Sequence, residues 1–473
     1  NQKMQIDLQP PMKIEKVIQN GETLEIDNEI NAHFIKLRKK QNVGDINFLE
    51  VYYSGQPKEA ANAPWDAGIT WTRDEKGLPF VASTCQGNGA SLWWPCKDHS
   101  YDEPDSMLIS VNVPKDLMNV SNGRLRGIDK GSKGTRTFHW FVSNPINNYG
   151  VNINIGNYVN FSEKYEGEKG MLDMDYYVLK QNLKKAKKQF VQAKMTVEAF
   201  EYWFGPYPFY EDSYKLVEAP YLGMEHQSSV TYGNGYQNGY KGTDLSSSGW
   251  GLKFDFIIVH ESGHEWFANN ITNIDMADMW IHEGFTAYSE NLFLNYHFGK
   301  KASAEYVIGT RLNITNDVPI IGLYEVNQRG SNDMYYKGAN ILHTLRQIVK
   351  DDEKWRQILR GLNKEFYHQT VNTMQIENYI AERIGINLES FFDQYLRDNR
   401  MPILEYFIKD QMLSVRWTNC ISEFEMPMKM DSNGNEYWIN PKTSWSKVET
   451  IESVDTIVLD ANFYIGSMNV LGN

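Results

Sequence analysis

The chain has 473 residues, of which 41% are hydrophobic and 13% aromatic. This length allows two to four domains with packed cores, and no apolar run approaches the roughly 20 residues that a membrane-spanning helix needs. The formal net charge of −13 argues against a nucleic-acid partner, because proteins that bind phosphate backbones carry basic surface.

Residues 1–178 are predicted to be mostly β-strands. Short segments rich in β-branched and aromatic residues, bounded by Gly, Asn, Asp and Pro, are typical of strands separated by turns. They occur at 5–8, 47–53, 106–113, 137–142 and 174–179. Strands are hard to identify before residue 40, so we expect the beginning of this region to be either trimmed or diverged.

From about residue 181 the apolar residues follow a helical period instead. Helices are predicted at 182–204, 252–269, 283–298, 334–350, 353–367, 373–383 and 388–398. After Pro402 the period returns to two, with strands predicted at 404–408, 413–417 and 456–459. The chain is therefore predicted to be a multidomain α+β protein with a β-rich part, a largely helical part and a small β part.

Three cysteines, Cys85, Cys96 and Cys420, are too few for a disulfide framework and lack the spacing of a zinc finger. A bridge between Cys85 and Cys96 and two free thiols are both allowed. The chain begins at Asn1 without a methionine, as expected of a processed precursor or a trimmed chain. An extracytoplasmic location is slightly favoured over a cytoplasmic one, but the compartment stays open.

The segment Val259–Phe267 contains the pattern His-Glu-x-x-His. Residues four apart lie on the same face of a helix, so His260 and His264 can direct their rings at one metal ion. Glu261 lies one position further round, near the ion but not needed as a ligand. An ordinary buried helix carrying two histidines by chance is the alternative, although the whole chain has only 10 histidines.

A third ligand is available in the next predicted helix. Glu283 follows His264 after eighteen intervening residues, and Glu290 falls on nearly the same helix face, because seven residues make almost two turns. One carboxylate can bind the metal while the second accepts the other N–H of a ligand histidine. Two histidines, one carboxylate and an open position are typical of catalytic zinc, so we expect one Zn²⁺ per chain, bound by His260, His264 and Glu283.

This pattern and spacing resemble the gluzincin aminopeptidases, the aminopeptidase N family that also contains leukotriene hydrolase. Three further segments are similar to motifs of that family, in the same order. Leu222-Gly-Met-Glu-His226 resembles its exopeptidase motif Gly-x-Met-Glu-Asn, and Tyr335-Tyr-Lys-Gly338 resembles its Tyr-x-Lys-Gly motif. Gln86 resembles the glutamine ahead of its Pro-Cys-x-Asp segment, which is Pro-Cys-Lys-Asp98 here.

The resemblance covers about residues 80–400 and departs from the family at three positions. Leu222 replaces a glycine, and His226 and His282 each replace an asparagine, while the neighbouring glutamates are retained. The resemblance implies a saddle-shaped β domain over residues 1–178. It further implies a thermolysin-like, mostly helical zinc domain over 179–402 and a small β-sandwich over 403–473.

The resemblance also implies a role for each matching residue. Glu261 would take a proton from the attacking water and pass it to the leaving amine. Tyr335 would donate a hydrogen bond to the oxyanion, with Tyr336 as the candidate if the register shifts by one. Glu225 would hold the free α-ammonium of the substrate, so that only the first peptide bond reaches the metal. Gln86 would add a neutral acceptor for the same ammonium, unless it is simply a turn residue.

We therefore expect a zinc aminopeptidase that hydrolyses the first peptide bond of peptides with a free amino terminus. One alternative is an epoxide hydrolase with aminopeptidase activity, as leukotriene hydrolase combines. Another is a non-catalytic peptide-binding relative, which the presence of Glu261 and Tyr335 disfavours. The expected partner is a peptide, with no nucleic acid and no transmembrane segment. The oligomeric state and the preferred first residue are left open.

Overall fold

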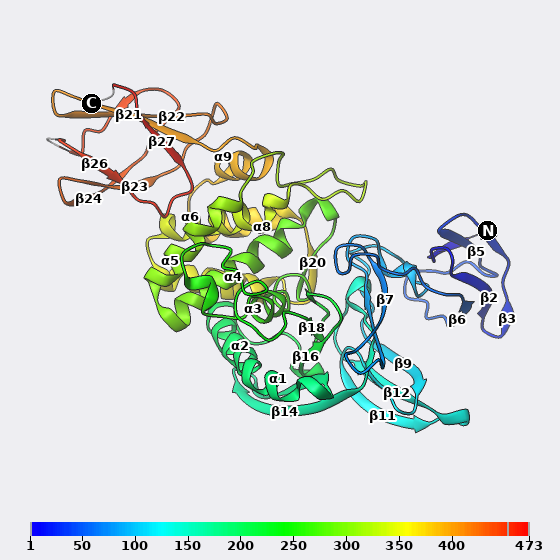
Figure 1. The fold of residues 1–473 in the computed structure, drawn as a ribbon. Helices are drawn as coiled ribbons and strands as arrows, with labels where there is room; N and C mark the ends of the chain where they lie inside the picture. Colours follow the sequence, from blue (N-terminus) through cyan, green and yellow to red (C-terminus); the bar gives the residue numbers. More distant parts are fainter. Residues whose placement is uncertain (1, 452–453, 472–473) are drawn as a thin grey trace. The chain divides into compact units, whose positions relative to one another are not determined.

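The structure is a computed structural model that describes residues 2–451 and 454–471. Residues 1, 452, 453, 472 and 473, which the predicted domain limits include, lie outside the described range. The chain divides into two compact units, residues 1–194 with 207–236 and residues 195–206 with 237–473. Strands precede a helical region, which is followed by further strands (Figure 1), so the predicted α+β fold class is confirmed. The limits predicted for three separate domains stay a prediction.

The first unit consists mainly of β-sheets. Its strands are β1 (Lys3–Asp7), β2 (Lys13–Gln19), β3 (Glu22–Thr23), β4 (Ile26–Asn28), β5 (Ala32–Lys36), β6 (Leu49–Ser54), β7 (Gly68–Arg73), β8 (Pro79–Thr84), β9 (Met107–Pro114), β10 (Met118–Val120), β11 (Arg124–Lys130), β12 (Thr135–Val142), β13 (Asn154–Gly156), β14 (Tyr158–Gly167), β15 (Gly170–Leu179), β16 (Tyr214–Glu218), β17 (Gly223–Met224) and β18 (Val230–Tyr232). Helix α1 (Leu183–Gln189) belongs to the same unit, and the limit between the units falls within α2 (Val191–Phe204).

Five of these strands, β1 to β5, lie before residue 40, and among them only β1 overlaps a predicted strand, the one at 5–8. They form parts of two small sheets, ordered β1-β5-β4 and β3-β2-β6. Their apolar side chains meet in a core of their own that includes Val17 and Ile35. Strands of two or three residues with mostly polar side chains, such as β3 and β4, carry no clear alternation, which is why they were hard to recognise.

The largest sheet of the first unit has the order β14-β15-β16-β18-β17. β14 and β15 form a long antiparallel hairpin (Figure 1), with Tyr158 opposite Leu179. β15, β16 and β18 then run parallel, and β17 pairs antiparallel with β18 at the edge. Tyr158 and Leu179 pack with Val217 and Trp140 in the core. Glu225 follows the short edge strand β17 directly.

The second unit is helical in its first part. Its helices are α3 (Phe256–Gly263), α4 (Trp280–Phe298), α5 (Lys300–Gly309), α6 (Tyr336–Val349), α7 (Asp352–Glu365), α8 (Thr373–Ile384) and α9 (Glu389–Phe392), and a π-helical turn, η10 (Asp393–Arg397), follows α9. Two short parallel strands, β19 (Ile271–Asn273) and β20 (Gln369–Val371), pair between them. Among the described residues, no helix has both the length and the apolar character needed to cross a membrane.

The predicted helix 182–204 is divided into α1 and α2, and the one predicted at 388–398 consists of α9 and η10. The helix predicted over 252–269 is shorter, because α3 begins at Phe256 and ends at Gly263. Trp266 and Phe267 extend its apolar character, but the backbone turns sharply at Ala268, where φ is 149°. Helix α5 was not predicted, because its sequence begins Lys-Lys-Ala-Ser and has a weak apolar period.

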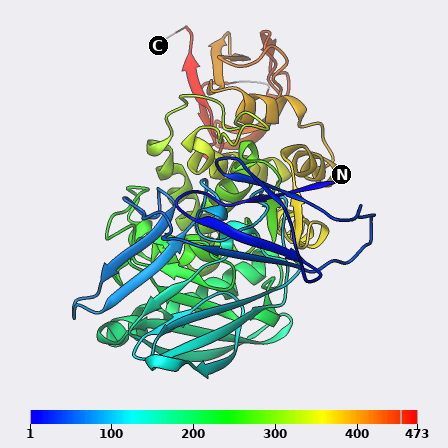
Figure 2. The same ribbon diagram turned by 90° about the vertical axis from the view of Figure 1, so that its right-hand side faces the viewer.

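The C-terminal strands, coloured orange to red, form two small sheets at one end of this unit (Figures 1 and 2). The sheet orders are β25-β22-β21-β27 and β24-β23-β26. The strands are β21 (Ile403–Lys409), β22 (Met412–Thr418), β23 (Met428–Ser432), β24 (Asn435–Ile439), β25 (Ser446–Lys447), β26 (Ile457–Leu459) and β27 (Gly466–Asn469).

Candidate active site

The two histidines of the His-Glu-x-x-His pattern lie at the end of α3. The helix begins with Asp255, whose side chain caps the N–H of Ile258, and all its residues are buried. His264 is the first residue after α3 but keeps helical angles, with φ −64° and ψ −17°. The spacing of four residues therefore still brings the rings of His260 and His264 together, with centroids 5.0 Å apart.

Glu283, in the first turn of α4, faces both rings. Its Oε2 lies 3.6 Å from Nε2 of His260 and 3.3 Å from Nε2 of His264. One ligand atom from each of the three residues lies within 4.8 Å of the other two, and all three residues are buried. The structure thus brings together the three residues predicted to bind zinc, although their role as ligands stays a prediction.

The far side of each ring is held by a hydrogen-bond acceptor. Nδ1 of His260 lies 2.8 Å from Oε1 of Glu290, and Nδ1 of His264 lies 2.9 Å from the carbonyl oxygen of Phe267. Because a carboxylate and a carbonyl can only accept, both Nδ1 atoms must carry the proton. Tyr306 of α5 donates a hydrogen bond of 2.5 Å to the other oxygen of Glu290.

These contacts fit a bound cation. With the protons on Nδ1, two neutral rings would point the lone pairs of Nε2 at the carboxylate of Glu283, and Oε2 of Glu283 has no hydrogen-bond partner within the described residues. Burial by itself lowers the pKa of His260, but Glu283 and Glu290 raise it well above its usual value. Burial raises the pKa of Glu283, and the two histidines outweigh that effect and hold it well below its usual range. The cluster therefore needs positive charge, which zinc supplies with this set of ligands.

Glu261 and Tyr335 belong to the same unit as this cluster. Glu261 is only 8% exposed, and its charge acts on His260, the residue before it. Tyr335 is the residue before α6, and its ring stacks at 24° to the ring of His260, with centroids 6.1 Å apart. Tyr336 begins α6, where burial raises the pKa of its phenol, so it stays protonated at neutral pH. The structure therefore places Tyr335, rather than its neighbour, in contact with a predicted zinc ligand ring.

Two glycines allow α6 to approach α4 closely enough for this contact. A Cβ atom on Gly338 would lie 2.8 Å from Cα of Gly284, a distance that real Cβ atoms essentially never show. Gly284 follows Glu283, and Gly338 ends the Tyr-x-Lys-Gly segment. The glycine of that segment is thus explained by helix packing, since only a residue without Cβ fits there.

Glu225 and Gln86 meet in the first unit. Nε2 of Gln86 donates a hydrogen bond of 2.7 Å to Oε1 of Glu225, and the hydroxyl of Tyr149 donates one of 3.2 Å to the same oxygen. Glu225 is only 3% exposed. Sequence reasoning missed Tyr149, which lies 76 residues before Glu225 in a turn and carries no motif. We call Gln86, Tyr149 and Glu225 the Glu225 cluster. In it, one oxygen of a buried carboxylate accepts hydrogen bonds from two neutral donors.

The two histidines that replace asparagines are both neutral. Burial lowers the pKa of His226 to about 3, and its Nδ1 lies 3.3 Å from the hydroxyl of Thr231. Burial also lowers the pKa of His282 to about 3, and its Nε2 accepts a hydrogen bond of 2.8 Å from the backbone N–H of Asn273. Both side chains are therefore uncharged hydrogen-bonding groups, as an asparagine would be.

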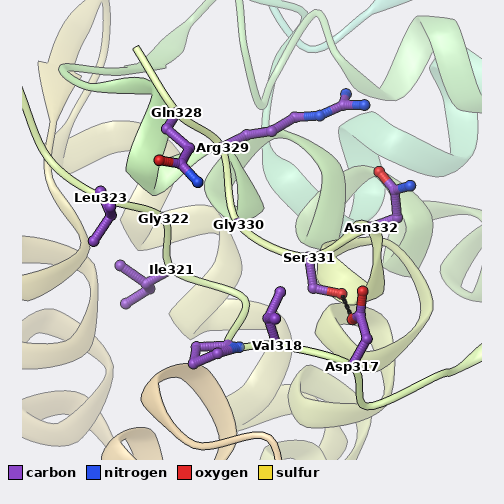
Figure 3. A pocket seen from close by; sticks show the side chains of 11 residues that line it. Asp317, Val318, Ile321, Gly322, Leu323, Gln328, Arg329, Gly330, Ser331 and Asn332 are labelled. Carbon is purple, nitrogen blue, oxygen red and sulfur yellow. Dashed lines mark hydrogen bonds between the residues drawn. The ribbon is translucent and has the colours of Figure 1, made fainter. Parts of the chain in front are cut away.

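A cavity of about 510 Å³ lies in the loop that precedes Tyr335. Residues 317–319, 321–323 and 328–332 line it, so the chain passes the cavity twice before reaching Tyr335 (Figure 3). Val318, Ile321 and Leu323 give one side of it an apolar surface, and Asp317 and Ser331 hydrogen-bond to each other at its edge.

Residues 189–395 match the family described as Peptidase family M1 domain. This region contains every residue of the metal cluster together with Glu225 and Tyr335. This part of the chain therefore matches peptidase family M1. The predicted relationship to the gluzincin aminopeptidases is thereby confirmed, and zinc is the metal of this family.

Curated M1 relatives are distant and longer. A leukotriene A-4 hydrolase from Xenopus laevis is 22% identical over 353 residues, which are 69% of this chain and 55% of the relative. A leucyl aminopeptidase from Saccharolobus solfataricus is 21% identical over 444 residues, or 89% of this chain and 54% of the relative. The chain thus spans about half the length of these relatives.

Solved M1 structures share the fold. A variant of a two-domain M1 zinc metallopeptidase bound to L-tryptophan has a TM-score of 0.71 at 19% identity, covering 85% of this chain and 87% of that one. A variant of an M1 zinc metallopeptidase from Deinococcus radiodurans, bound to the substrate Tyr-Ser-Ala, has a TM-score of 0.68 at 19% identity, covering 84% of this chain and 86% of that one.

Proposed function

We propose that the protein is a zinc aminopeptidase that removes the first residue from peptides with a free amino terminus. The observation that carries this proposal is the presence of two clusters that each offer a buried carboxylate to a positively charged group. One, His260, His264 and Glu283, needs a cation at its centre, and the other, around Glu225, offers a buried carboxylate for a second cationic group. The family supports hydrolysis of a peptide bond, and the second cluster supports the restriction to amino termini.

At the first cluster, His260, His264 and Glu283 would bind zinc and leave a position open. When bound, zinc supplies Lewis acidity that polarises a carbonyl and makes water more acidic. Glu261 accepts the proton of the attacking water and delivers it to the amine that leaves. The hydroxyl of Tyr335 donates a hydrogen bond to the oxygen on which negative charge develops.

Glu225 would determine which peptide bond of the substrate is cleaved. Gln86 and Tyr149 donate hydrogen bonds to one oxygen of its carboxylate, and this carboxylate would bind the α-ammonium group of the substrate. A charge-assisted hydrogen bond from that ammonium fixes the register of the peptide, because an internal residue has no charge to offer. In this arrangement Gln86 supports Glu225 and could turn its amide oxygen to the same ammonium. The solved M1 relatives bound to single amino acids or to Tyr-Ser-Ala support a subsite for a first residue.

Hydrolysis of short peptides of known sequence, with and without a chelator, tests the proposal. The expected result is stepwise release of single residues from the amino terminus, loss of this activity with the chelator, and recovery with added zinc. Release of internal fragments would contradict the aminopeptidase assignment. No turnover at full zinc occupancy would favour the peptide-binding alternative. An epoxide substrate in the same experiment would reveal the activity that leukotriene hydrolase combines with peptide cleavage.

A further inference from the structure

The loop before Tyr335 is fastened at both ends. Residues 314–331, here the connecting loop, join the 3-10 turns η8 (Thr310–Asn313) and η9 (Asn332–Met334) without a helix or strand. Asp333, in η9, accepts hydrogen bonds from the backbone N–H groups of Thr315 at 2.9 Å and Asn316 at 2.6 Å. The carboxylate is 3% exposed. The start of the loop is thus tied to a residue two positions before Tyr335.

A C-terminal segment holds the same loop from outside. Nδ2 of Asn316 donates a hydrogen bond of 3.0 Å to the hydroxyl of Tyr464, which lies 148 residues later in the chain. The backbone N–H of Tyr464 donates one of 3.1 Å to the hydroxyl of Thr344 in α6. Tyr464 therefore contacts the chain both before and after Tyr335.

Neighbouring contacts fix Tyr464 itself. The guanidinium of Arg311, in η8, donates to the carbonyl oxygens of Ala461 at 2.8 Å and Asn462 at 3.3 Å, and lies 5.5 Å from the ring centroid of Tyr464. The ring of His343, in α6, lies 2.8 Å from Oδ1 of Asn462. These contacts attach Ala461, Asn462 and Tyr464 to η8 and α6.

We propose that Tyr464 is a positioning residue for Tyr335. The hydroxyl of Tyr464 fixes Asn316, and Asp333 binds the backbone of Thr315 and Asn316. Asp333 lies two residues before Tyr335, the residue that precedes α6, so these contacts set the position of Tyr335. A hydrogen-bond donor for an oxyanion contributes most when its place is fixed in advance, and displacement by a fraction of an ångström weakens it. This inference rests on the proposed function, in which Tyr335 binds the oxyanion. It gives the C-terminal β region a role in catalysis without a group of its own in the active site.

The substitution Tyr464→Phe removes the hydroxyl and keeps the ring that packs against Arg311. Tyr406→Phe, which removes a hydroxyl from β21 of the same region, is the matched control. In hydrogen–deuterium exchange, Tyr464→Phe should speed exchange over residues 314–337 and leave α3 and α4 unchanged, whereas the control should match the wild type. This measurement needs no turnover, so it tests the coupling even if the proposed function fails. Unchanged exchange over 314–337 would overturn the inference.

Kinetics then test whether the coupling reaches Tyr335. We expect Tyr464→Phe to lower kcat about five-fold, the effect of one neutral hydrogen bond on a barrier, with KM and zinc content as in the wild type. In a Tyr335→Phe background the same substitution should cause no further loss, because its effect passes through the hydroxyl already removed. An equal five-fold loss in that background would overturn the positioning role. It would leave the proposed function intact, because that function is judged on the wild type alone.

Discussion

The metal cluster and the Glu225 cluster are built in different ways. His260 lies in α3 and His264 directly follows it at a spacing of four residues, and Glu283 lies in the first turn of α4, the next α-helix. Gln86, Tyr149 and Glu225 come from three distant turns and strand ends of the first unit, with 139 residues between the first and the last. Each cluster contains a buried carboxylate, Glu283 in the first and Glu225 in the second.

The sequence alone therefore reveals the first cluster more readily than the second. Chemistry that depends on helix spacing is visible in a few residues, because an α-helix fixes which side chains share a face. The proposed selection of the bond would depend on Glu225, a carboxylate whose partners are assembled by the tertiary fold. If the account is correct, changes in the first cluster should remove hydrolysis altogether, whereas changes in the second should alter which peptides are cut.

Replacement of the general base should have the largest effect at the metal cluster. Glu261→Gln keeps the size of the side chain and removes its ability to accept a proton, so kcat should fall about 10²- to 10⁴-fold. Zinc content, measured by atomic emission after dialysis, should stay at the wild-type level because Glu261 is not a ligand. Loss of zinc together with activity would show that Glu261 contributes to metal binding instead.

The residues behind the histidines should tune zinc affinity. Glu290→Gln keeps an acceptor for His260 but removes the negative charge, so zinc affinity should fall about ten-fold, at the lower end of the range for such partners. Competition with a fluorescent chelator measures this change. Tyr306→Phe removes only a donor to Glu290 and should weaken zinc by a smaller factor. An effect of Tyr306→Phe larger than that of Glu290→Gln would contradict this order.

Zinc binding should release protons and weaken as pH falls. In the metal-free protein the neighbouring carboxylates outweigh burial and raise the pKa of His260 well above its usual value, which favours the protonated ring. Zinc must displace that proton, and its apparent affinity should drop about ten-fold for each unit of pH per proton displaced. Calorimetry at pH 7 in buffers of different ionisation enthalpy counts the protons. A binding enthalpy that is independent of the buffer would contradict this expectation.

The two donors to Glu225 should have smaller effects on catalysis than Glu261. Gln86→Ala and Tyr149→Phe each remove one hydrogen bond to a charged group, so kcat/KM for free-amine substrates should fall by roughly ten-fold in each variant. Because both donors meet the same oxygen, their effects should not be additive. Equal losses on amino-blocked substrates would show that these residues support the fold rather than the recognition of an amino terminus.

Much of the metal cluster could be predicted from the sequence, and the reasons are local. The spacing of four residues gave His260 and His264, and the spacing of seven gave Glu283 and Glu290 on one face of α4. Tyr306 could not be predicted, because it lies on the unrecognised helix α5. The end of α3 was misjudged, because apolar residues continue past it while the backbone does not remain helical.

Contacts between segments that lie far apart in the chain could not be predicted from the sequence. Nothing in the turn around Tyr149 indicates that its hydroxyl meets Glu225. The hydrogen bond between Asn316 and Tyr464 joins a loop to the C-terminal β region, for which the sequence showed no chemistry. Short polar strands such as β3 and β4 were missed for a related reason, since their pairing depends on partners that lie elsewhere in the chain.

The most direct test compares cleavage of a free-amine peptide and its acetylated counterpart by the wild type and by Glu225→Ala. The wild type should cleave only the free-amine peptide. Glu225→Ala should lower kcat/KM for that peptide at least 100-fold, consistent with the loss of a buried, charge-assisted contact, while zinc content is unchanged. The preference for a free amine should then disappear. An undiminished preference in Glu225→Ala would contradict the account, because the carboxylate proposed to recognise the amino terminus would have no part in it.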